Sequence, residues 1–294
     1  VDLQAVGKEV GVSMIKKSKA SAGCKHSNPI ISVILCIVAL IQVFPLYWMI
    51  TLSLKSNQEV YGENLIGLPR DWEWDNYLTA VSRGNVGHYF LNSAIVTVAT
   101  ILFTLLLSAM VTFAIVRLKW RFSGVVYSIF LLGLMLSIQA VLLPLYVMLK
   151  GILNTYWALI LPYVAFALPT SVLLMVGAMR DLPRELEEAA FIDGANVYRI
   201  FFHVVLPLLK PIMAAVAILT YLNTWNELML AVTFVSGEDF KTLTVGINDL
   251  VGKYSTDWGV MGAGLTIATI PSVALFALLS NNIRKSLTLG AVKG

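Results

Sequence analysis

Residues 187–195 read Glu-Glu-Ala-Ala-Phe-Ile-Asp-Gly-Ala, and Val205-Leu206-Pro207 follow them after a short interval. This acidic segment is the exception in a chain of 294 residues, of which 58% are apolar and only 13% are charged. An average soluble domain is about a quarter charged, so the composition indicates a membrane protein. We therefore expect the segment to lie in water, on a loop between membrane-spanning helices.

Six apolar stretches on either side of this loop are long enough to be transmembrane helices, because about 20 residues cross a ~30 Å hydrocarbon core. They cover residues 30–54, 91–116, 122–148, 157–179, 212–235 and 259–283. The first stretch is too long for a signal peptide and lacks a small-residue cleavage site, so we expect it to be retained. The predicted fold class is an all-α polytopic membrane protein with six transmembrane helices.

The positions of the basic residues predict how these helices are oriented. Of the 21 Lys and Arg residues, 15 lie in residues 1–29, 117–121, 180–211 and 284–294. Cytoplasmic loops carry an excess of Lys and Arg, so these segments and both termini are predicted to be cytoplasmic. Residues 1–29 are then a cytoplasmic N-terminal segment and residues 30–294 a single membrane domain. The largest outer loops are 55–90 and 236–258.

Residues 180–211, here called the acidic loop, have the pattern of two short helices. Pro183 and the acids behind it favour the first turn of a helix, and Gly194 supplies a C-terminal stop. A second helix is expected from Ala195 to Val205, closed by Pro207. An alternative is a helix lying on the inner leaflet, but such helices are basic and this one is acidic.

We therefore interpret the tip of the acidic loop as a docking site for another protein. Small residues let a second backbone approach closely, and Glu188 and Asp193 can pair with arginines of a partner. The predicted docking residues are Glu187, Glu188, Ala189, Ala190, Asp193, Gly194 and Ala195.

The order Glu188-Ala189-Ala190-x-x-Asp193-Gly194-Ala195, followed by Val205-Leu206-Pro207, resembles the EAA loop of binding-protein-dependent ABC importer permeases. Other segments resemble the carbohydrate-uptake branch, the family of the maltose permease subunit MalG, with its type I importer fold. They are residues 154–162, 182–187, 207–211, 224–227 and 290–294. The resemblance covers about residues 30–294.

This resemblance implies a six-helix permease of a sugar importer in the bacterial cytoplasmic (inner) membrane, with the EAA loop as a cytoplasmic coupling helix. Its expected partners are a second permease subunit in a heterodimer, two ATPase subunits and an extracytoplasmic sugar-binding protein, which the outer loop 236–258 would enter. No cofactor is expected on this chain, since ATP and Mg²⁺ belong to the ATPases. The alternatives are an amino-acid or peptide permease, or an ion-coupled secondary transporter. The last would need several ionisable groups in the membrane, where Glu227 is the one candidate.

A polar cluster in the fifth apolar stretch is the candidate substrate pathway, and it consists of Asn223, Trp225, Asn226 and Glu227. An ionisable group within a membrane usually marks a pathway, and a Trp ring beside amides and a carboxylate suits a sugar. Asn223, Asn226 and Glu227 are spaced to share one helix face. The alternative, which stays open, is that these polar groups hold neighbouring helices together.

Gln139, beside Ser137 and ahead of Pro144, has two interpretations. It is either part of the pathway or, as we favour, a local repair of the backbone carbonyl that a proline leaves unpaired. No catalytic or metal site is predicted, and no nucleic-acid partner. Residues 246–254 resemble a phosphate-binding loop but have the wrong glycine spacing and Tyr254 where Ser or Thr is required. Energy for transport must therefore come from separate subunits.

Overall fold

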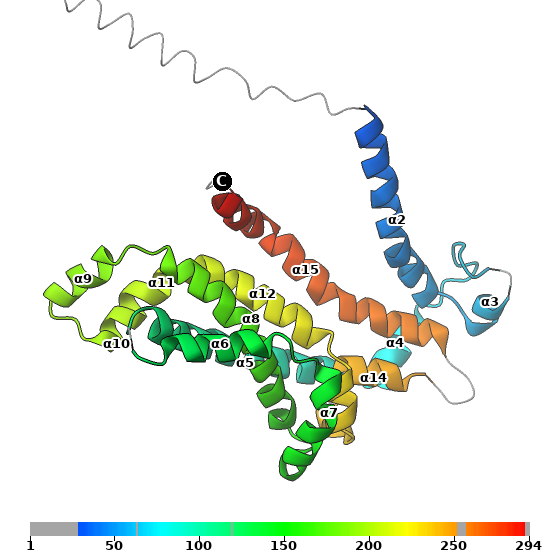
Figure 1. Cartoon of the computed structure of the whole chain (residues 1–294). Coiled ribbons are helices and arrows are strands. Elements are labelled where there is room, and N and C mark those ends of the chain that lie inside the picture. The colour runs from blue at the N-terminus through cyan, green and yellow to red at the C-terminus, as the bar shows by residue number, and fades with distance from the viewer. Residues whose placement is uncertain (1–28, 63, 119, 252–256, 292–294) are drawn as a thin grey trace, which may run out of the picture. The chain divides into compact units, whose positions relative to one another are not determined.

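The computed structural model describes residues 29–62, 64–118, 120–251 and 257–291, with side chains up to residue 277 (Figure 1). Within these ranges the regular structure is helical throughout, which agrees with the predicted all-α class. The predicted N-terminal segment 1–29 lies almost wholly outside the described residues. The chain divides into two units, residues 1–48 and 49–294.

The long helices are separated by short helical turns. The first half comprises α2 Pro29–Ser53, α3 Asn57–Tyr61, α4 Asp75–Ser82, α5 Val86–Val116, α6 Ser123–Gly133, α7 Ile138–Met148, η1 Lys150–Ile152 and α8 Tyr156–Arg180. The second half comprises α9 Glu185–Ile192, α10 Val197–Ile200, the π-helix η2 Phe201–Val205, α11 Leu206–Leu208, α12 Lys210–Trp225, α13 Met229–Phe234, η3 Glu238–Phe240, α14 Leu243–Asp249 and α15 Trp258–Ala291.

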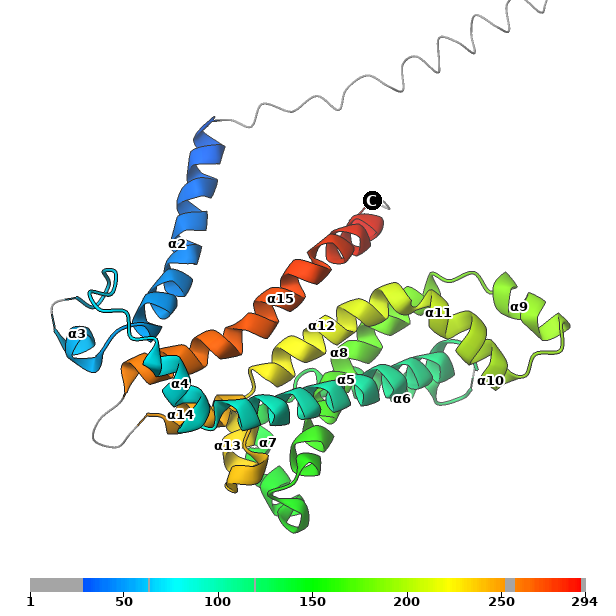
Figure 2. The same cartoon turned by 180° about the vertical axis from the view of Figure 1, so that it is seen from behind.

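Helices α5, α8 and α12 pack along one another and form the centre of the second unit (Figures 1 and 2). Small hydroxyl side chains recur on the buried side of α5, where they let the neighbouring backbones approach closely. They are Ser93, Thr97, Thr100, Thr104, Ser108 and Thr112. Apolar clusters fill the rest of the interface, including Val96 against Leu159 and Ala109 against Met175.

Within the described residues, four helices are long and apolar enough to cross a membrane: α2, α5, α8 and α15. The predicted third span is two helices, because α6 and α7 meet at an angle of 105°. Ser137 begins α7 by accepting a hydrogen bond from the amide of Ala140, at 3.4 Å. A second bend of 74° separates residues 197–208 from α12, so up to six spans result if each bent pair crosses once.

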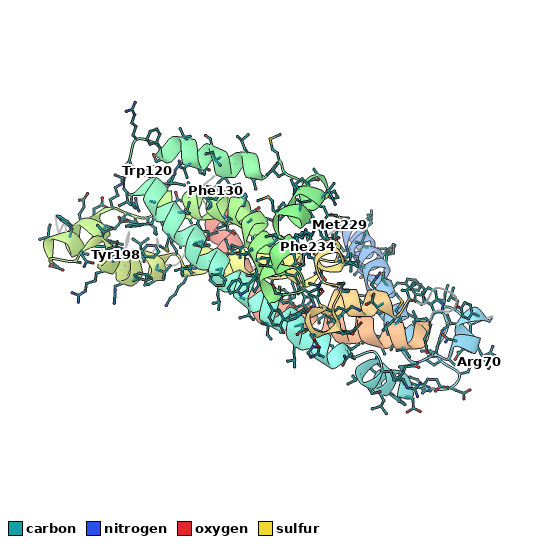
Figure 3. All side chains as sticks on the ribbon, turned by 90° about the horizontal axis from the view of Figure 1, so that it is seen from below. Arg70, Trp120, Phe130, Tyr198, Met229 and Phe234 are labelled. Carbon is teal, nitrogen blue, oxygen red and sulfur yellow. The ribbon has the colours of Figure 1, made fainter. Side chains whose placement is uncertain are left out.

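The predicted fifth span, residues 212–235, is also not one helix. Helix α12 ends at Trp225, and the chain turns before α13 begins at Met229. The acidic loop, with α9 and α10, extends from one end of the bundle, whereas α4, α13 and α14 lie at the other (Figures 1 and 2). Figure 3 shows the same separation, with Tyr198 of α10 and Arg70 of the segment between α3 and α4 at opposite ends.

Candidate functional site

The first helix of the acidic loop forms as the sequence predicts. Helix α9 carries its acids in the first turn and ends at Ile192, with Asp193 as its C-cap residue. Gly194 has φ +82°, a left-handed conformation that glycine adopts without a steric penalty. The amide of Ala195 then donates to the carbonyl oxygen of Ala190 at 3.0 Å, which satisfies one of the last carbonyls of the helix. The predicted glycine stop is confirmed.

The second helix of the acidic loop differs from its predicted bounds. Helix α10 begins at Val197, and the Oδ1 atom of Asn196 accepts a hydrogen bond from the Arg199 amide at 2.8 Å. The chain continues as the π-helix η2 and as α11, so Pro207 lies within a helix and does not end it. π-Helices are rare and occur often at functional sites.

The solvent-exposed face of α9, here called its outer face, combines unpaired carboxylates with large apolar side chains. Glu188 and Asp193 are exposed, and neither forms an ion pair with any other described residue. Phe191 and Ile192 are 70% and 84% exposed, although they occupy the variable positions of the predicted motif and were not selected from the sequence.

The predicted alanine-lined tip is only partly correct. Ala189 is exposed, but Ala190 and Ala195 pack inward against an apolar cluster that includes Ile200 and Phe201. Side chains on a helix follow a period of 3.6 residues, so consecutive alanines face different sides. Ala190 and Ala195 therefore support the loop from within.

Glu187 was predicted to dock a partner, but in the structure its carboxylate is paired within its own chain. Its Oε1 atom lies 2.7 Å from Nε of Arg117, and the two side chains are 17% and 6% exposed. The Nε–H bond is not directed at that oxygen, so the contact is an ion pair and not a hydrogen bond. Nη2 of Arg117 donates to the carbonyl oxygens of Met179 and Leu182, at 3.0 and 2.9 Å. Glu187 thus faces its own bundle, roughly 100° around the helix from Glu188.

A polar cavity of about 280 Å³ lies where α8, α12 and the break between α6 and α7 meet. Its polar lining is Tyr163, Asn223, Thr224 and Glu227, and its apolar lining is Leu136, Ile138, Phe166 and Ala167. The side chain of Asn223 is exposed to this space and makes no hydrogen bond with another described residue. The Asn223 amide is therefore free to meet a polar ligand.

Glu227 is held by three hydrogen bonds within the chain. Oε1 accepts from the amide of Leu230 at 2.9 Å, and Oε2 accepts from the amide of Ala231 at 3.2 Å and from the Tyr163 hydroxyl at 2.7 Å. The carboxylate thereby caps the N-terminus of α13, where the helix dipole favours a negative charge. The backbone oxygen of Glu227 accepts from the hydroxyl of Thr244 at 2.9 Å. Glu227 joins α8, α13 and α14.

The predicted shared face of Asn223, Asn226 and Glu227 is wrong, because α12 ends at Trp225. Asn226 lines a separate pocket of about 440 Å³ between α12, α14 and α15, and its amide donates to the Leu222 carbonyl at 2.8 Å. The structure places Asn223 and Glu227 on one side of the chain and Asn226 on another.

Trp225 is buried, and it belongs to the lining of the 440 Å³ pocket with Asn226, not to the cavity beside Glu227. Its ring stacks on Tyr221 with centroids 5.5 Å apart and meets the edge of Phe90 at 5.4 Å. The indole Nε1 donates to the carbonyl of Ala268 at 3.1 Å, which ties α12 to α15. The polar atom of a buried Trp usually finds such a partner.

Gln139 does not repair the backbone at Pro144. It is exposed in the first turn of α7, and its Oε1 atom accepts from the Ser137 hydroxyl at 3.1 Å. The break lies before Ser137, and α7 continues through Pro144. Gln139 is also absent from the lining of the 280 Å³ cavity, although Leu136 and Ile138 belong to it.

The segment 236–249 is folded against the protein's own helices. The side chain of Asn154 accepts from the amides of Ser236 and Gly237, at 2.7 and 2.9 Å. Lys241 pairs with Glu238 at 2.5 Å and Asp249 at 2.7 Å. The Lys241 ammonium, with the Tyr89 hydroxyl, lowers the pKa of the Glu238 carboxyl from 4.5. Residues 252–256, near the C-terminal end of the loop predicted to enter a binding protein, lie outside the described residues.

A family model described as a binding-protein-dependent transport system inner membrane component matches residues 105–289, a range that includes the acidic loop and the polar cavity. The chain belongs to this family. As an inner membrane component with several apolar helices, it is embedded in a membrane.

Known relatives agree with this assignment over most of the chain. It is 37% identical over 253 residues to the probable ABC transporter permease protein YurM of Bacillus subtilis, covering 85% of this chain and 84% of YurM. It is 34% identical over 283 residues to the diacetylchitobiose uptake system permease protein NgcG of Streptomyces coelicolor, covering 95% and 93%. A solved bacterial ABC transporter involved in import of the acidic polysaccharide alginate has a chain of the same fold. The TM-score is 0.74 at 20% identity, over 86% of this chain and 94% of that one.

Proposed function

We propose that this chain is a permease subunit of an ATP-driven importer that carries a sugar, most simply an oligosaccharide, into the cell. Membership of the binding-protein-dependent family supports the transport class. The carbohydrate assignment is supported by the similarity to a diacetylchitobiose uptake permease over 95% of the chain. An amino-acid or peptide importer of the same class is the alternative.

The observation that carries the coupling proposal is the outer face of α9. Two free carboxylates, Glu188 and Asp193, lie beside the exposed side chains of Phe191 and Ile192. Exposed apolar groups of this size rimmed by charge mark a protein interface, and carboxylates pair strongly with arginine. We assign this face as the dock for a separate ATPase. Gly194 and Ala195 lie between α9 and α10, outside this face.

The complete importer, in this proposal, contains a second permease subunit, two ATPase subunits and an extracytoplasmic sugar-binding protein. ATP and Mg²⁺ are held by the ATPases, and this chain is not catalytic. The six spans are α2, α5, the bent pair α6 and α7, α8, residues 212–235 with α12 and α13, and α15, within a membrane domain of residues 30–294. Both termini, with residues 1–29 and the acidic loop, are cytoplasmic, in line with the excess of Lys and Arg in those segments.

The substrate path in this subunit passes the 280 Å³ cavity. Asn223 and Thr224 offer an amide and a hydroxyl to sugar hydroxyls, and the Tyr163 hydroxyl lies beside them. Glu227 shapes this cavity through its bonds to α8 and α13, as described above. Closure of the ATPases moves the docked helices together, and the bundles alternate between inward-open and outward-open states, a rocking motion common among transporters.

Reconstitution tests the proposal. The chain is placed in liposomes together with its second permease subunit, its ATPase and its binding protein, with ATP inside. Uptake is measured with radiolabelled maltotriose, raffinose, N,N′-diacetylchitobiose and an alginate trisaccharide, and with leucine as the competing class. We expect uptake of at least one sugar that needs ATP and the binding protein. Uptake of leucine alone, or sugar uptake driven by an ion gradient without the ATPase, would refute the proposal.

A further inference from the structure

Arg117, the residue directly after α5, is a buried cation that contacts two other helices. Its side chain is 6% exposed, and its Nε atom lies 2.7 Å from the carboxylate of Glu187 in the first turn of α9. Its Nη2 atom donates to the carbonyl oxygens of Met179 and Leu182, at the end of α8. One guanidinium therefore connects the ends of α5 and α8 with the beginning of α9.

The chemistry of arginine explains why one side chain makes all these contacts. A guanidinium has five donors in a rigid planar fork, whereas a lysine ammonium is a single point of charge. The last carbonyls of a helix lack their usual partner four residues further along. The Met179 oxygen accepts from the amide of Leu182 at 3.3 Å and from Arg117 as well, and Leu182 lies just beyond the end of α8. A buried charge is unfavourable unless it is paired, and Glu187 supplies the pairing.

Helix α5 is distant in sequence from the acidic loop, so this contact connects two elements that are not adjacent along the chain. Movement of α9 reaches α8 through residues 181–184 and reaches α12 through α10, η2 and α11. It reaches α5 through side chains: the Arg117–Glu187 pair and the ring contact between Phe113 and Phe201, whose centroids are 5.2 Å apart.

We propose that Arg117 is a positioning residue that couples α9 to α5, so that α5, α8 and α9 move as one body when the ATPases close. This inference rests on the proposed function, because α9 must be the helix that the ATPases hold. In this arrangement Glu187 contacts the protein's own Arg117, while Glu188 next to it faces the ATPase.

The test uses the complete importer in liposomes, with ATP hydrolysis and sugar uptake measured on the same vesicles. The substrate is whichever of maltotriose, raffinose, N,N′-diacetylchitobiose and the alginate trisaccharide the unaltered importer carries. The variants are Glu187→Gln and Arg117→Lys. The matched control is Glu185→Gln, which removes an exposed acid from the same helical turn. Co-purification with the ATPase is recorded for each.

We expect Glu187→Gln to bind the ATPase as the control does, but to carry roughly two- to thirtyfold less sugar per ATP hydrolysed. Arg117→Lys keeps the charge, so its sugar uptake per ATP hydrolysed should lie between the values for Glu187→Gln and for the control. A normal ratio in both variants would overturn the inference. So would loss of ATPase binding in Glu187→Gln, which would make it a direct contact, or failure of both variants to assemble, which would make the pair a folding contact. If the unaltered importer shows no ATP-dependent uptake, the proposed function itself fails.

Discussion

The hydroxyl of Tyr163 on α8 donates a hydrogen bond of 2.7 Å to the Glu227 carboxylate, at the gap between α12 and α13. The same carboxylate accepts from the amides of Leu230 and Ala231. A carboxylate that accepts three hydrogen bonds from its own chain serves mainly to hold helices together. It can shape a polar cavity without binding the substrate itself.

Loss of these hydrogen bonds should therefore lower stability more than transport. Tyr163→Phe removes one hydrogen bond to a charged group and should cost about 1.5–3 kcal/mol. Glu227→Ala should cost more, because it also leaves two amides and the Tyr163 hydroxyl without a partner. Thermal denaturation of the assembled complex measures this, with uptake divided by the amount of intact complex. A large fall in normalised uptake at unchanged stability would place Glu227 in the substrate path after all.

Asn223 should behave in the opposite way. Its side chain faces the cavity and has no bond to another described residue, so Asn223→Leu should lower normalised uptake severalfold with little change in stability. Asn226→Leu is the matched control, since Asn226 lines a different pocket. Equal effects of the two substitutions on uptake would contradict the separation of these pockets.

The sequence predicted the acidic loop better than it predicted the polar cluster, for physical reasons. Gly194 ends α9 because a left-handed residue is a local requirement that glycine meets. The directions of Glu187 and Glu188 depend on a distant arginine, and no spacing within the loop reveals Arg117.

The prediction for the polar cluster was wrong because helix α12 ends within the cluster. The spacing of Asn223, Asn226 and Glu227 predicts a shared face only if the helix continues, and the apolar composition of residues 228–235 gave no sign that it stops. Glu227 itself explains the stop, because its carboxylate begins a new helix at Met229. Trp225 was assigned to the substrate pathway from its neighbours in sequence, whereas its burial depends on Tyr221, Phe90 and Ala268.

Charge reversal on the outer face of α9 should weaken the ATPase dock. Glu188→Lys removes a charge-assisted contact of about 1.5–3 kcal/mol, which is roughly a ten- to hundredfold loss of affinity. Glu185→Lys is the control, an exposed acid of the same helix. Gly194→Val should also weaken the dock, because a β-branched residue is strained at φ +82°. ATPase binding to purified permease pairs measures the effect, and wild-type affinity in Glu188→Lys would contradict the assigned face.

The outer segment 236–249 should lose order in acid. Lys241 and Tyr89 lower the pKa of Glu238 in the folded protein, so its contribution is complete above the ordinary value of 4.5. That contribution is lost as the pH falls through the lowered pKa. Hydrogen exchange of this segment between pH 3 and 7 should therefore show protection falling in acid, and Glu238→Gln should flatten the change. An unaltered pH profile in Glu238→Gln would exclude this ion pair as the cause.

The central claim, that α9 holds a separate ATPase, is tested most directly by thiol cross-linking in membranes containing the whole importer. Cys24 and Cys36 are replaced, and single cysteines are introduced by Ala189→Cys on α9 and, as the control, by Gly62→Cys in the first outer loop. We predict that Ala189→Cys cross-links to the ATPase and Gly62→Cys does not. Labelling of Ala189→Cys by an impermeant reagent from outside the cell, with no ATPase cross-link, would contradict the account.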